Sequence, residues 1–394
     1  LGGGWTAAAE TSTIVGEDLF RAELLAFPLL FLVALWVFRG LVAALLPPLM
    51  GALVIFGGYF FLGVSNQVFG VSVYALNLVT GLGLGLAIDY SLLMVSRYRE
   101  EIARRGPGVE ALAATLRSAG VSVIFSAITV GAALAGLMIF PQNFMFSMGL
   151  GGLIVALVAA VVAVGVLPAV LALLGTRVNA LAPKRWRRAT EHADELETKG
   201  GWYRLSRFVM RRPVVVAIAS GAFMLLLAWP ALGIRFTTTD TRVLPQSSSA
   251  RQVDETLARE FPGDRYSPVF EAITAPKTPE AQQKITAWAK DISALPHVQQ
   301  VQPPLYLGKD TWQVNIFSDA PPLDQSSIDL VDAVQARPPP YPSLTGGFTA
   351  LFVAQKASLG AHLPWAILVI VLVTIIALFL MTGSVVLPIK AVVM

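Results

Sequence analysis

Residues 81 to 90 place a carboxylate inside an otherwise apolar stretch, "GLGLGLAIDY". Gly81, Gly85 and Asp89 are spaced four apart, so they share one face if the stretch is helical. An ionised carboxylate in the middle of a membrane costs roughly 2.5 to 3.5 kcal/mol on an insertion scale, and it therefore needs a partner, a proton or water. Small residues let a neighbouring helix approach closely. The sequence thus predicts that Asp89 faces a helix interface, where it could carry a proton.

Hydroxyl groups near Asp89 could complete a proton relay. Tyr90 points about 100° away around a helix and could reach a second helix. Ser118, Ser122 and Ser126 are spaced four apart in the next apolar stretch and form a polar stripe that could face Asp89. Two simpler readings remain open: Asp89 is a structural residue bonded to a nearby Ser or Thr, and the serine stripe only packs helices.

Other chemistry finds little support in the sequence. The alternating glycines resemble part of a nucleotide-binding loop, but no strand precedes them and no soluble helix follows. Cysteine is absent, which excludes disulfides, thiolate metal sites and cysteine nucleophiles. The three histidines, His192, His297 and His362, have no second ligand nearby in the sequence. We therefore expect no enzymatic activity, no metal and no cofactor.

The elements that position these residues are membrane spans. Hydrophobic residues make up 55% of the 394 residues and charged residues only 14%, against about a quarter in soluble proteins. The mean hydropathy is +0.66. With about 20 apolar residues per span, spans are predicted near 20–38, 41–62, 70–96, 119–140, 146–174, 213–233 and 362–382, and an eighth begins near 383. The chain opens at Leu1 without a signal-like segment, which indicates a fragment or a processed start.

Charge in the connections orients these spans. Arginines follow the first and third spans, and the stretch 177–212 is rich in Lys and Arg, whereas "GVSNQVFG" and "FPQNF" carry no charge. By the positive-inside rule the basic connections are cytoplasmic. The residues between about 235 and 360 are then extracytoplasmic.

This extracytoplasmic stretch alternates helical and extended patterns. Helices are predicted in "SSARQVDETLAREF", "TPEAQQKITAWAKDISAL" and "QSSIDLVDAVQA", and strands in "SPVFEAITA", "HVQQVQ" and "TWQVNIFSD". Thr278 and either Ser248 or Ser249 stand at helix N-cap positions. Alternation at this density predicts an α+β ferredoxin-like domain, with an unrelated α+β domain as the alternative.

The predicted fold is a membrane α-helical bundle with about seven complete spans and a partial eighth, joined to that extracytoplasmic domain. The predicted divisions are the end of a first extracytoplasmic domain (1–19), a five-span bundle (20–175), a basic cytoplasmic linker (176–212), a span (213–233), the porter-like domain (234–361) and a span with the start of the next (362–394).

A weak internal repeat indicates duplication. "GGGWTA" at 2–7 corresponds to "TGGFTA" at 345–350, and "GLVAALLP" at 40–47 resembles "GSVVLP" at 383–388. Repeated bundles are common in transporters. If the chain is one part of such a duplication, the second copy of "GLGLGLAIDY" and the first copy's outer domain lie outside it.

These motifs carry a family resemblance over nearly the whole chain. "GLGLGLAIDYSLLMVSRYREE", "FSAITV", "FPQ" and "DTRVLP" resemble the MMPL family, the mycobacterial-type large membrane proteins of the resistance-nodulation-division (RND) superfamily. The resemblance implies a proton-driven exporter of lipids or other hydrophobic molecules. It also implies that Asp89, Tyr90 and Ser126 form one half of a proton relay, whose counterpart would lie beyond Met394.

The expected protein is thus a multi-pass plasma-membrane exporter whose partners are a hydrophobic substrate, the membrane and the remainder of the transporter. No nucleic-acid partner is expected, because the basic "PKRWRR" at 183–188 fits anionic headgroups better. The alternatives are a protein-export accessory subunit, a sterol-sensing-like lipid receptor and an inactive truncated or split half-transporter.

Overall fold

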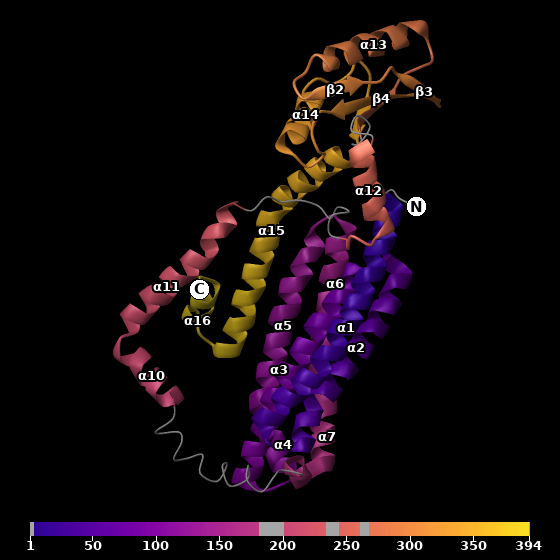
Figure 1. Cartoon of the computed structure of the whole chain (residues 1–394). Helices are drawn as coiled ribbons and strands as arrows, with labels where there is room; N and C mark the ends of the chain where they lie inside the picture. Colours follow the sequence, from indigo (N-terminus) through magenta and orange to yellow (C-terminus); the bar gives the residue numbers. More distant parts are fainter. Residues whose placement is uncertain (1–3, 181–200, 234–243, 261–267, 394) are drawn as a thin grey trace. The chain divides into compact units, whose positions relative to one another are not determined.

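The computed structural model describes residues 4–180, 201–233, 244–260 and 268–393 (Figure 1). The chain divides into two compact units. Leu1–Glu17 and Phe236–Leu363 form the first, which we call the sheet unit. Asp18–Arg235 and Pro364–Met394 form the second, the helical unit. The basic "PKRWRR" segment lies outside the described residues.

The helical unit contains long apolar helices, and two of them, α1 and α15, also extend into the sheet unit. The elements in chain order are α1 (Gly4–Phe38), α2 (Leu41–Phe69), α3 (Tyr74–Arg105), α4 (Val109–Thr115), η1 (Leu116–Gly120), α5 (Val121–Ala135), η2 (Gly136–Ile139), α6 (Asn143–Val161), η3 (Val162–Val166), α7 (Leu167–Leu174), η4 (Gly175–Asn179), α10 (Gly201–Arg211), α11 (Pro213–Ala228), η5 (Trp229–Gly233), α15 (Phe348–Thr382) and α16 (Val386–Val393). Among the described residues, 7 helical stretches are long and apolar enough to cross a membrane. This confirms the seven predicted spans.

Helices α2, α3 and α6 form the packed centre of this unit and lie side by side in Figure 1. Two glycines permit the close approach. A Cβ atom on Gly58 of α2 would lie 2.6 Å from Val79 Cγ1 of α3, and one on Gly83 of α3 would lie 2.7 Å from Val155 Cγ2 of α6. Small residues at such contacts allow tight van der Waals packing, which is the main source of helix association in lipid.

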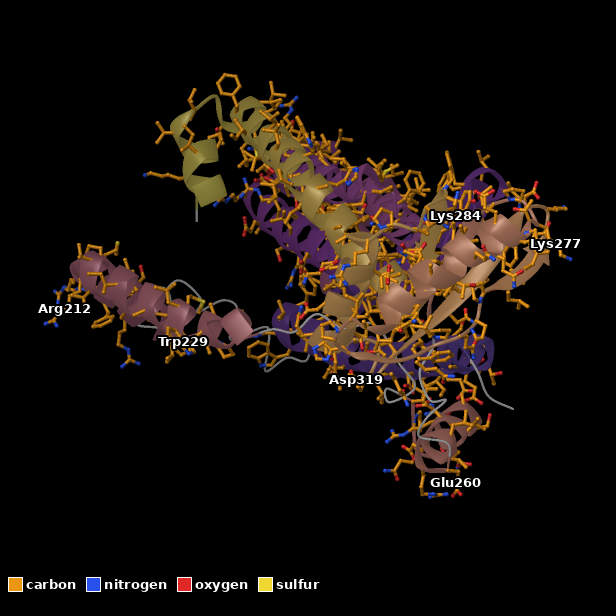
Figure 2. The ribbon with its side chains drawn as sticks, turned by 90° about the horizontal axis from the view of Figure 1, so that it is seen from above. Arg212, Trp229, Glu260, Lys277, Lys284 and Asp319 are labelled. Carbon is orange, nitrogen blue, oxygen red and sulfur yellow. The ribbon has the colours of Figure 1, made fainter. Side chains whose placement is uncertain are left out.

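The spans α1, α11 and α15 expose most of their apolar surface within the described residues. Figure 2 shows Arg212 and Trp229 at opposite ends of α11, a pairing of basic and aromatic residues that suits the two membrane interfaces. Apolar side chains on these helices are compatible with contact to lipid tails.

Two spans are interrupted by π-helical turns. In the fourth span η1 lies between α4 and α5, and in the fifth η3 lies between α6 and α7. The two turns contact each other, and both contact α3. π-turns are frequent at functional positions in helices. Because both turns contact α3, that helix is a candidate location for a functional site.

The sheet unit holds a five-stranded antiparallel sheet. Its elements besides the ends of α1 and α15 are α12 (Ser249–Glu260), β1 (Val269–Thr274), α13 (Pro279–Ser293), β2 (Val298–Val301), β3 (Leu305–Gly308), β4 (Thr311–Ser318), α14 (Gln325–Gln335) and β5 (Ser343–Gly346). The strand order is β2-β4-β1-β5, and β3 also pairs with β4. In the central register Ile273 of β1 lies opposite Trp312 of β4 and Ser343 of β5.

The core of the sheet unit forms where alternate strand residues meet α13 and α14. Ile273 and Ile316 from the sheet and Ile285 from α13 are fully buried. Helix α13 begins at the predicted cap, because the Thr278 hydroxyl accepts a hydrogen bond from the Ala281 amide at 3.2 Å. The opposite side of α13 is polar, and Lys284 stands on its exposed surface (Figure 2).

The sequence patterns miss two strands and underestimate two helices. Strands β3 and β5 are not predicted, because four residues each are too few to display a clear alternation. Helices α1 and α15 begin well before the apolar spans predicted at 20–38 and 362–382. The first turns of both helices lie before the stretch in which the sequence predicts a span.

Candidate proton-relay site

Helix α3 carries the predicted site at its centre. Its buried side, which includes Val79, Ala87 and Met94, packs in the core of the helical unit. The helix runs without a proline from Tyr74 to Arg105, so Asp89 and Tyr90 occupy regular helical positions. Their side chains leave the helix about 100° apart.

Tyr90 is 4% exposed, and its hydroxyl donates a hydrogen bond to the Ser126 hydroxyl of α5. The oxygen-to-oxygen distance is 3.4 Å, which is long for two hydroxyls. The structure therefore brings together two of the three residues predicted from the sequence, through a long hydrogen bond.

Asp89 is exposed within the described chain and has no hydrogen bond or ion pair to any described residue. It is also the only Asp or Glu between residues 24 and 99. Helices α2 and α6, which pack most extensively against α3, and α5, whose Ser126 bonds Tyr90, contain no Asp, Glu, Lys, Arg or His, whereas the short helix α4, which also contacts α3, carries Glu110. A carboxylate within a membrane-spanning helix is rare and costly, so Asp89 is a candidate functional position.

The side of α3 that holds Asp89 is uncovered by the described residues. A Cβ atom on Gly81 or on Gly85 would meet nothing within 4 Å, and Ser122 and Ser126 of α5 are exposed. We call Gly81, Gly85, Asp89, Ser122 and Ser126 the open relay face. The expectation that Gly81 and Gly85 contact a neighbouring helix is not met within the described part of the chain, where Gly83 makes the tight contact instead.

The serine stripe has a second contact with α3 two turns further along. Ser118 accepts a hydrogen bond of 3.1 Å from Nε of Arg97, and the Ser122 hydroxyl donates to the Ser118 carbonyl at 3.2 Å. The sequence reasoning missed Arg97. Its signal was the seven-residue spacing from Tyr90, which places both side chains on one face of α3.

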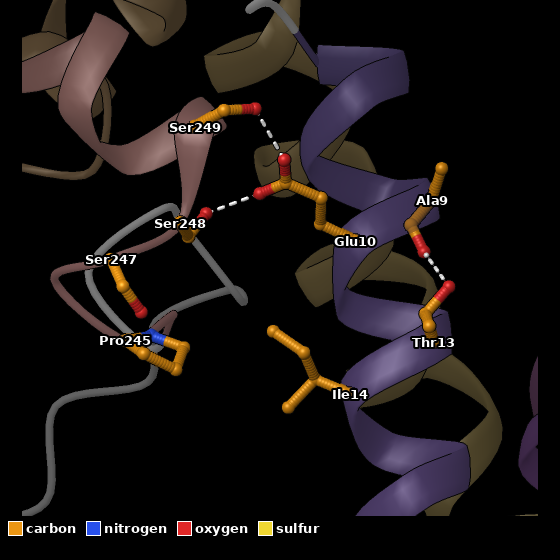
Figure 3. Close-up of a pocket in the computed structure, with 8 residues that line it drawn as sticks. All are labelled: Ala9, Glu10, Thr13, Ile14, Pro245, Ser247, Ser248 and Ser249. Atoms are coloured by element: carbon orange, nitrogen blue, oxygen red, sulfur yellow. Dashed lines mark hydrogen bonds between the residues drawn. The ribbon is translucent and has the colours of Figure 1, made fainter.

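A second carboxylate joins distant segments in the sheet unit. Figure 3 shows Glu10 of α1 between the hydroxyls of Ser248 and Ser249, both of which donate to it. The Ala250 amide at the start of α12 also donates to Glu10, at 3.3 Å. Glu10 thus caps the N-terminus of α12, where an anion is favoured. Ile14 and Pro245 line the adjoining shallow groove.

A metal centre finds no support in the described part of the chain, which contains no group of three His, Cys, Asp or Glu that could hold an ion. The site around Asp89 offers one carboxylate and the hydroxyl groups of Tyr90 and Ser126. Groups of these types can exchange a proton.

Comparison with known proteins identifies a family and several relatives of this chain. A family profile described as the MMPL family matches residues 1–216. A membrane protein of Streptomyces coelicolor is 35% identical over 379 residues, which are 95% of this chain and 51% of that protein. The trehalose monomycolate exporter MmpL3 of Mycobacterium tuberculosis is 33% identical over 429 residues, 98% of this chain and 45% of the exporter.

A further relative is the mycolic acid-containing lipids exporter MmpL11 of Mycolicibacterium smegmatis, which is 28% identical over 100% of this chain and 42% of its own length. The chain thus spans about half the length of the curated relatives it matches.

Proposed function

The chain belongs to the MMPL family of multi-pass plasma-membrane transporters, and we propose that it forms a relay-bearing part of an exporter driven by the proton-motive force. The observation that carries this proposal is the lone carboxylate of Asp89, which adjoins the Tyr90–Ser126 hydrogen bond and faces away from the packed core.

The proposed driving step is protonation of Asp89. A proton arriving from outside neutralises the carboxylate and removes the need for a polar partner. When the proton leaves to the cytoplasm, the charge returns and the partner is needed again. Each proton that crosses supplies roughly 2.3 kcal/mol per 100 mV of membrane potential. The two states of Asp89 thereby favour two arrangements of the bundle.

The proposed partner is a second relay-bearing bundle that covers the open relay face. An uncovered carboxylate beside Gly81 and Gly85 suits a closely packed helix better than lipid. The shares of relatives that this chain covers are also compatible with a partner of similar size.

The proposed cargo is a lipid or another hydrophobic molecule. Two relatives are named as exporters of trehalose monomycolate and of mycolic acid-containing lipids. The sheet unit is then a porter domain of ferredoxin-like fold. Its strand order β2-β4-β1-β5, with helices α13 and α14 between strands, is the arrangement that a split βαβ unit gives.

The test is proton uptake in proteoliposomes with an inward pH gradient. The chain is reconstituted with and without a second relay-bearing bundle, and wild type is compared with Asp89→Asn. We expect uptake that requires both the second bundle and Asp89. Glu110→Gln is the matched control, because Glu110 is an exposed carboxylate of α4 in the same unit.

Normal uptake by Asp89→Asn overturns the proposal. Saturable lipid binding by wild type, without uptake in either condition, would instead support a receptor.

A further inference from the structure

The short helix before the span α11 carries charge that the proposed function does not use. Helix α10 (Gly201–Arg211) holds Arg204, Arg207 and Arg211, and Arg212 follows it. No Asp or Glu occurs between residues 198 and 239. The three arginines of α10 are exposed, and they have no hydrogen bond or ion pair to another described residue. Their positive charge is therefore not neutralised by any residue that the structure describes.

The arginines and the apolar residues of α10 stand on opposite faces. Arg204, Arg207 and Arg211 are spaced three and four residues apart, which places them within about 60° of one another around the helix. Leu205 and Val209 are four residues apart and leave the helix on the other side. Leu205 is 51% exposed and Val209 is 37% exposed. A helix with one basic and one apolar face, both uncovered within the described chain, is suited to lie in a membrane interface.

The junction with α11 lets α10 leave the direction of the span. Arg212 has φ −135° and ψ 54°, outside the helical region, and Pro213 begins α11. A proline disfavours the helical conformation in the residue before it. Figure 1 shows the change of direction between the two helices. Because α11 is a candidate span that starts at Pro213, α10 adjoins the end of that span which the positive-inside rule assigns to the cytoplasm.

Both faces together favour a lipid surface over other anionic ligands. A nucleic acid or a free phosphate ion would bind the arginines but leave Leu205 and Val209 in water. A bilayer covers both faces, because acyl chains accommodate the apolar residues and headgroup phosphates accept hydrogen bonds from the guanidinium groups. Arginine stems are long enough to lie along apolar surface while the charge stays among the headgroups.

We propose that α10 is an interfacial helix that binds anionic lipid headgroups of the cytoplasmic leaflet. Arg204, Arg207 and Arg211 contact the phosphates, and Leu205 and Val209 enter the boundary between headgroups and acyl chains. The helix has 11 residues and is thus about 16 Å long. Once bound, it fixes the depth at which α11 enters the membrane. This role does not depend on the proposed proton relay.

The test places one reporter on the apolar face of α10 in the full chain. The chain contains no cysteine, so Val209→Cys carries a single nitroxide label. The labelled chain is reconstituted into vesicles of phosphatidylcholine, with or without phosphatidylglycerol. Collisions with oxygen and with a water-soluble nickel chelate report whether the label is immersed. We expect an immersed label in the anionic vesicles, a mainly aqueous label in the neutral ones, and a smaller difference at high salt.

The arginines are then changed in the labelled chain. Arg204→Gln with Arg207→Gln should lower the ratio of immersed to aqueous label in anionic vesicles about fivefold per arginine, roughly 25-fold for both. Arg204→Lys with Arg207→Lys keeps the charge and should retain immersion. Lys284→Gln with Lys290→Gln removes two exposed charges from α13 and should change nothing. Thermal unfolding in detergent checks that the Gln variant is folded, and if it is not, the salt dependence of the wild-type helix decides the question.

Several results would overturn the proposal. A label immersed equally in both kinds of vesicle means that α10 binds by its apolar face alone, and a label that is aqueous in both means that it does not bind lipid. A label that stays immersed after both arginines are replaced by Gln shows that these arginines do not recognise the headgroups. If a short RNA immobilises the label while anionic lipid does not immerse it, the basic face binds nucleic acid instead.

Discussion

The hydroxyl of Tyr90 lies 3.4 Å from the hydroxyl of Ser126, and this contact joins α3 to α5 beside the lone carboxylate of Asp89. Tyr90 belongs to the core of the helical unit, but the Ser126 hydroxyl is not needed to fill that core, because Ser126 is exposed within the described chain. The contact therefore fits the proposed exchange of protons better than it fits packing.

Replacing Ser126 with Ala should slow proton uptake without unfolding the bundle. A hydrogen bond of this kind contributes about 0.5 to 1.5 kcal/mol, which corresponds to a rate lower by a factor of roughly 2 to 13. Uptake in proteoliposomes is the measurement. Thr129→Ala is the control, since Thr129 lies on the same helix outside the open relay face and its hydroxyl bonds the Phe125 carbonyl. Equal effects of both variants would argue against a specific role for Ser126.

Replacing Gly83 with Ala should destabilise the helical unit by about 1 to 3 kcal/mol, because the new Cβ would lie 2.7 Å from Val155 Cγ2. The new Cβ of Gly85→Ala would meet nothing within 4 Å. In the absence of a second bundle, this variant should therefore be as stable as wild type or slightly more stable. Thermal unfolding in detergent tests both variants. Gly85→Ala should instead weaken association with a second relay-bearing bundle.

Replacing Gly347 with Ala should destabilise the sheet unit by more than about 1 kcal/mol. Gly347 has φ +107°, and a Cβ there would lie 2.4 Å from the Pro268 carbonyl oxygen. Gly360→Ala in α15 is the control, because its Cβ meets nothing within 4 Å and alanine favours helix. Urea unfolding followed by tryptophan fluorescence should separate the two, and similar midpoints would contradict the expectation.

The ion pair between Glu280 and Lys284 should stabilise the first turns of α13 only at intermediate pH. The hydrogen bond and charge of Lys284 lower the pKa of Glu280, and Glu280 raises the pKa of Lys284. The contribution of Glu280 is thus present above its unfolded pKa and is lost as the pH falls through its lower folded value. The contribution of Lys284 is lost as the pH rises through the raised pKa that Lys284 has in the folded protein.

The measurement for this pair is amide hydrogen exchange in α13, comparing wild type with Lys284→Gln at equal pH. We expect slightly slower exchange in wild type at pH 7 and equal exchange at pH 3, since exposed pairs contribute little. A difference that persists at pH 3 would mean that the Lys284 stem stabilises α13 by packing alone.

The membrane spans could be predicted from the sequence because a run of about 20 apolar residues has few other uses. Helical spacing also placed Tyr90 and the serine stripe on definite faces, but the bond between Tyr90 and Ser126 could be seen only in the structure. The cap at Thr278 followed from the same local rules.

What the sequence did not predict depends on distant segments. Gly81 and Gly83 look alike in "GLGLGLAIDY", but only the packing of α3 on α6 distinguishes the contact glycine from the uncovered one. The hydrogen bond between Ser248 and Glu10 joins residues that are 238 positions apart. No periodicity in the sequence predicts such a pair. The residues of "PKRWRR" lie outside the described ranges, so their interaction with headgroups remains a prediction.

The same pair has a consequence for biogenesis. Glu10 leaves the ribosome before Ser248, which follows after 238 further residues. At about 5 to 20 residues per second the interval is roughly 12 to 48 s. During that time Glu10 has no contact with α12, while the spans that lie between α1 and α12 in the sequence are synthesised. The contact of α12 with α1 therefore forms only after the intervening spans have been synthesised.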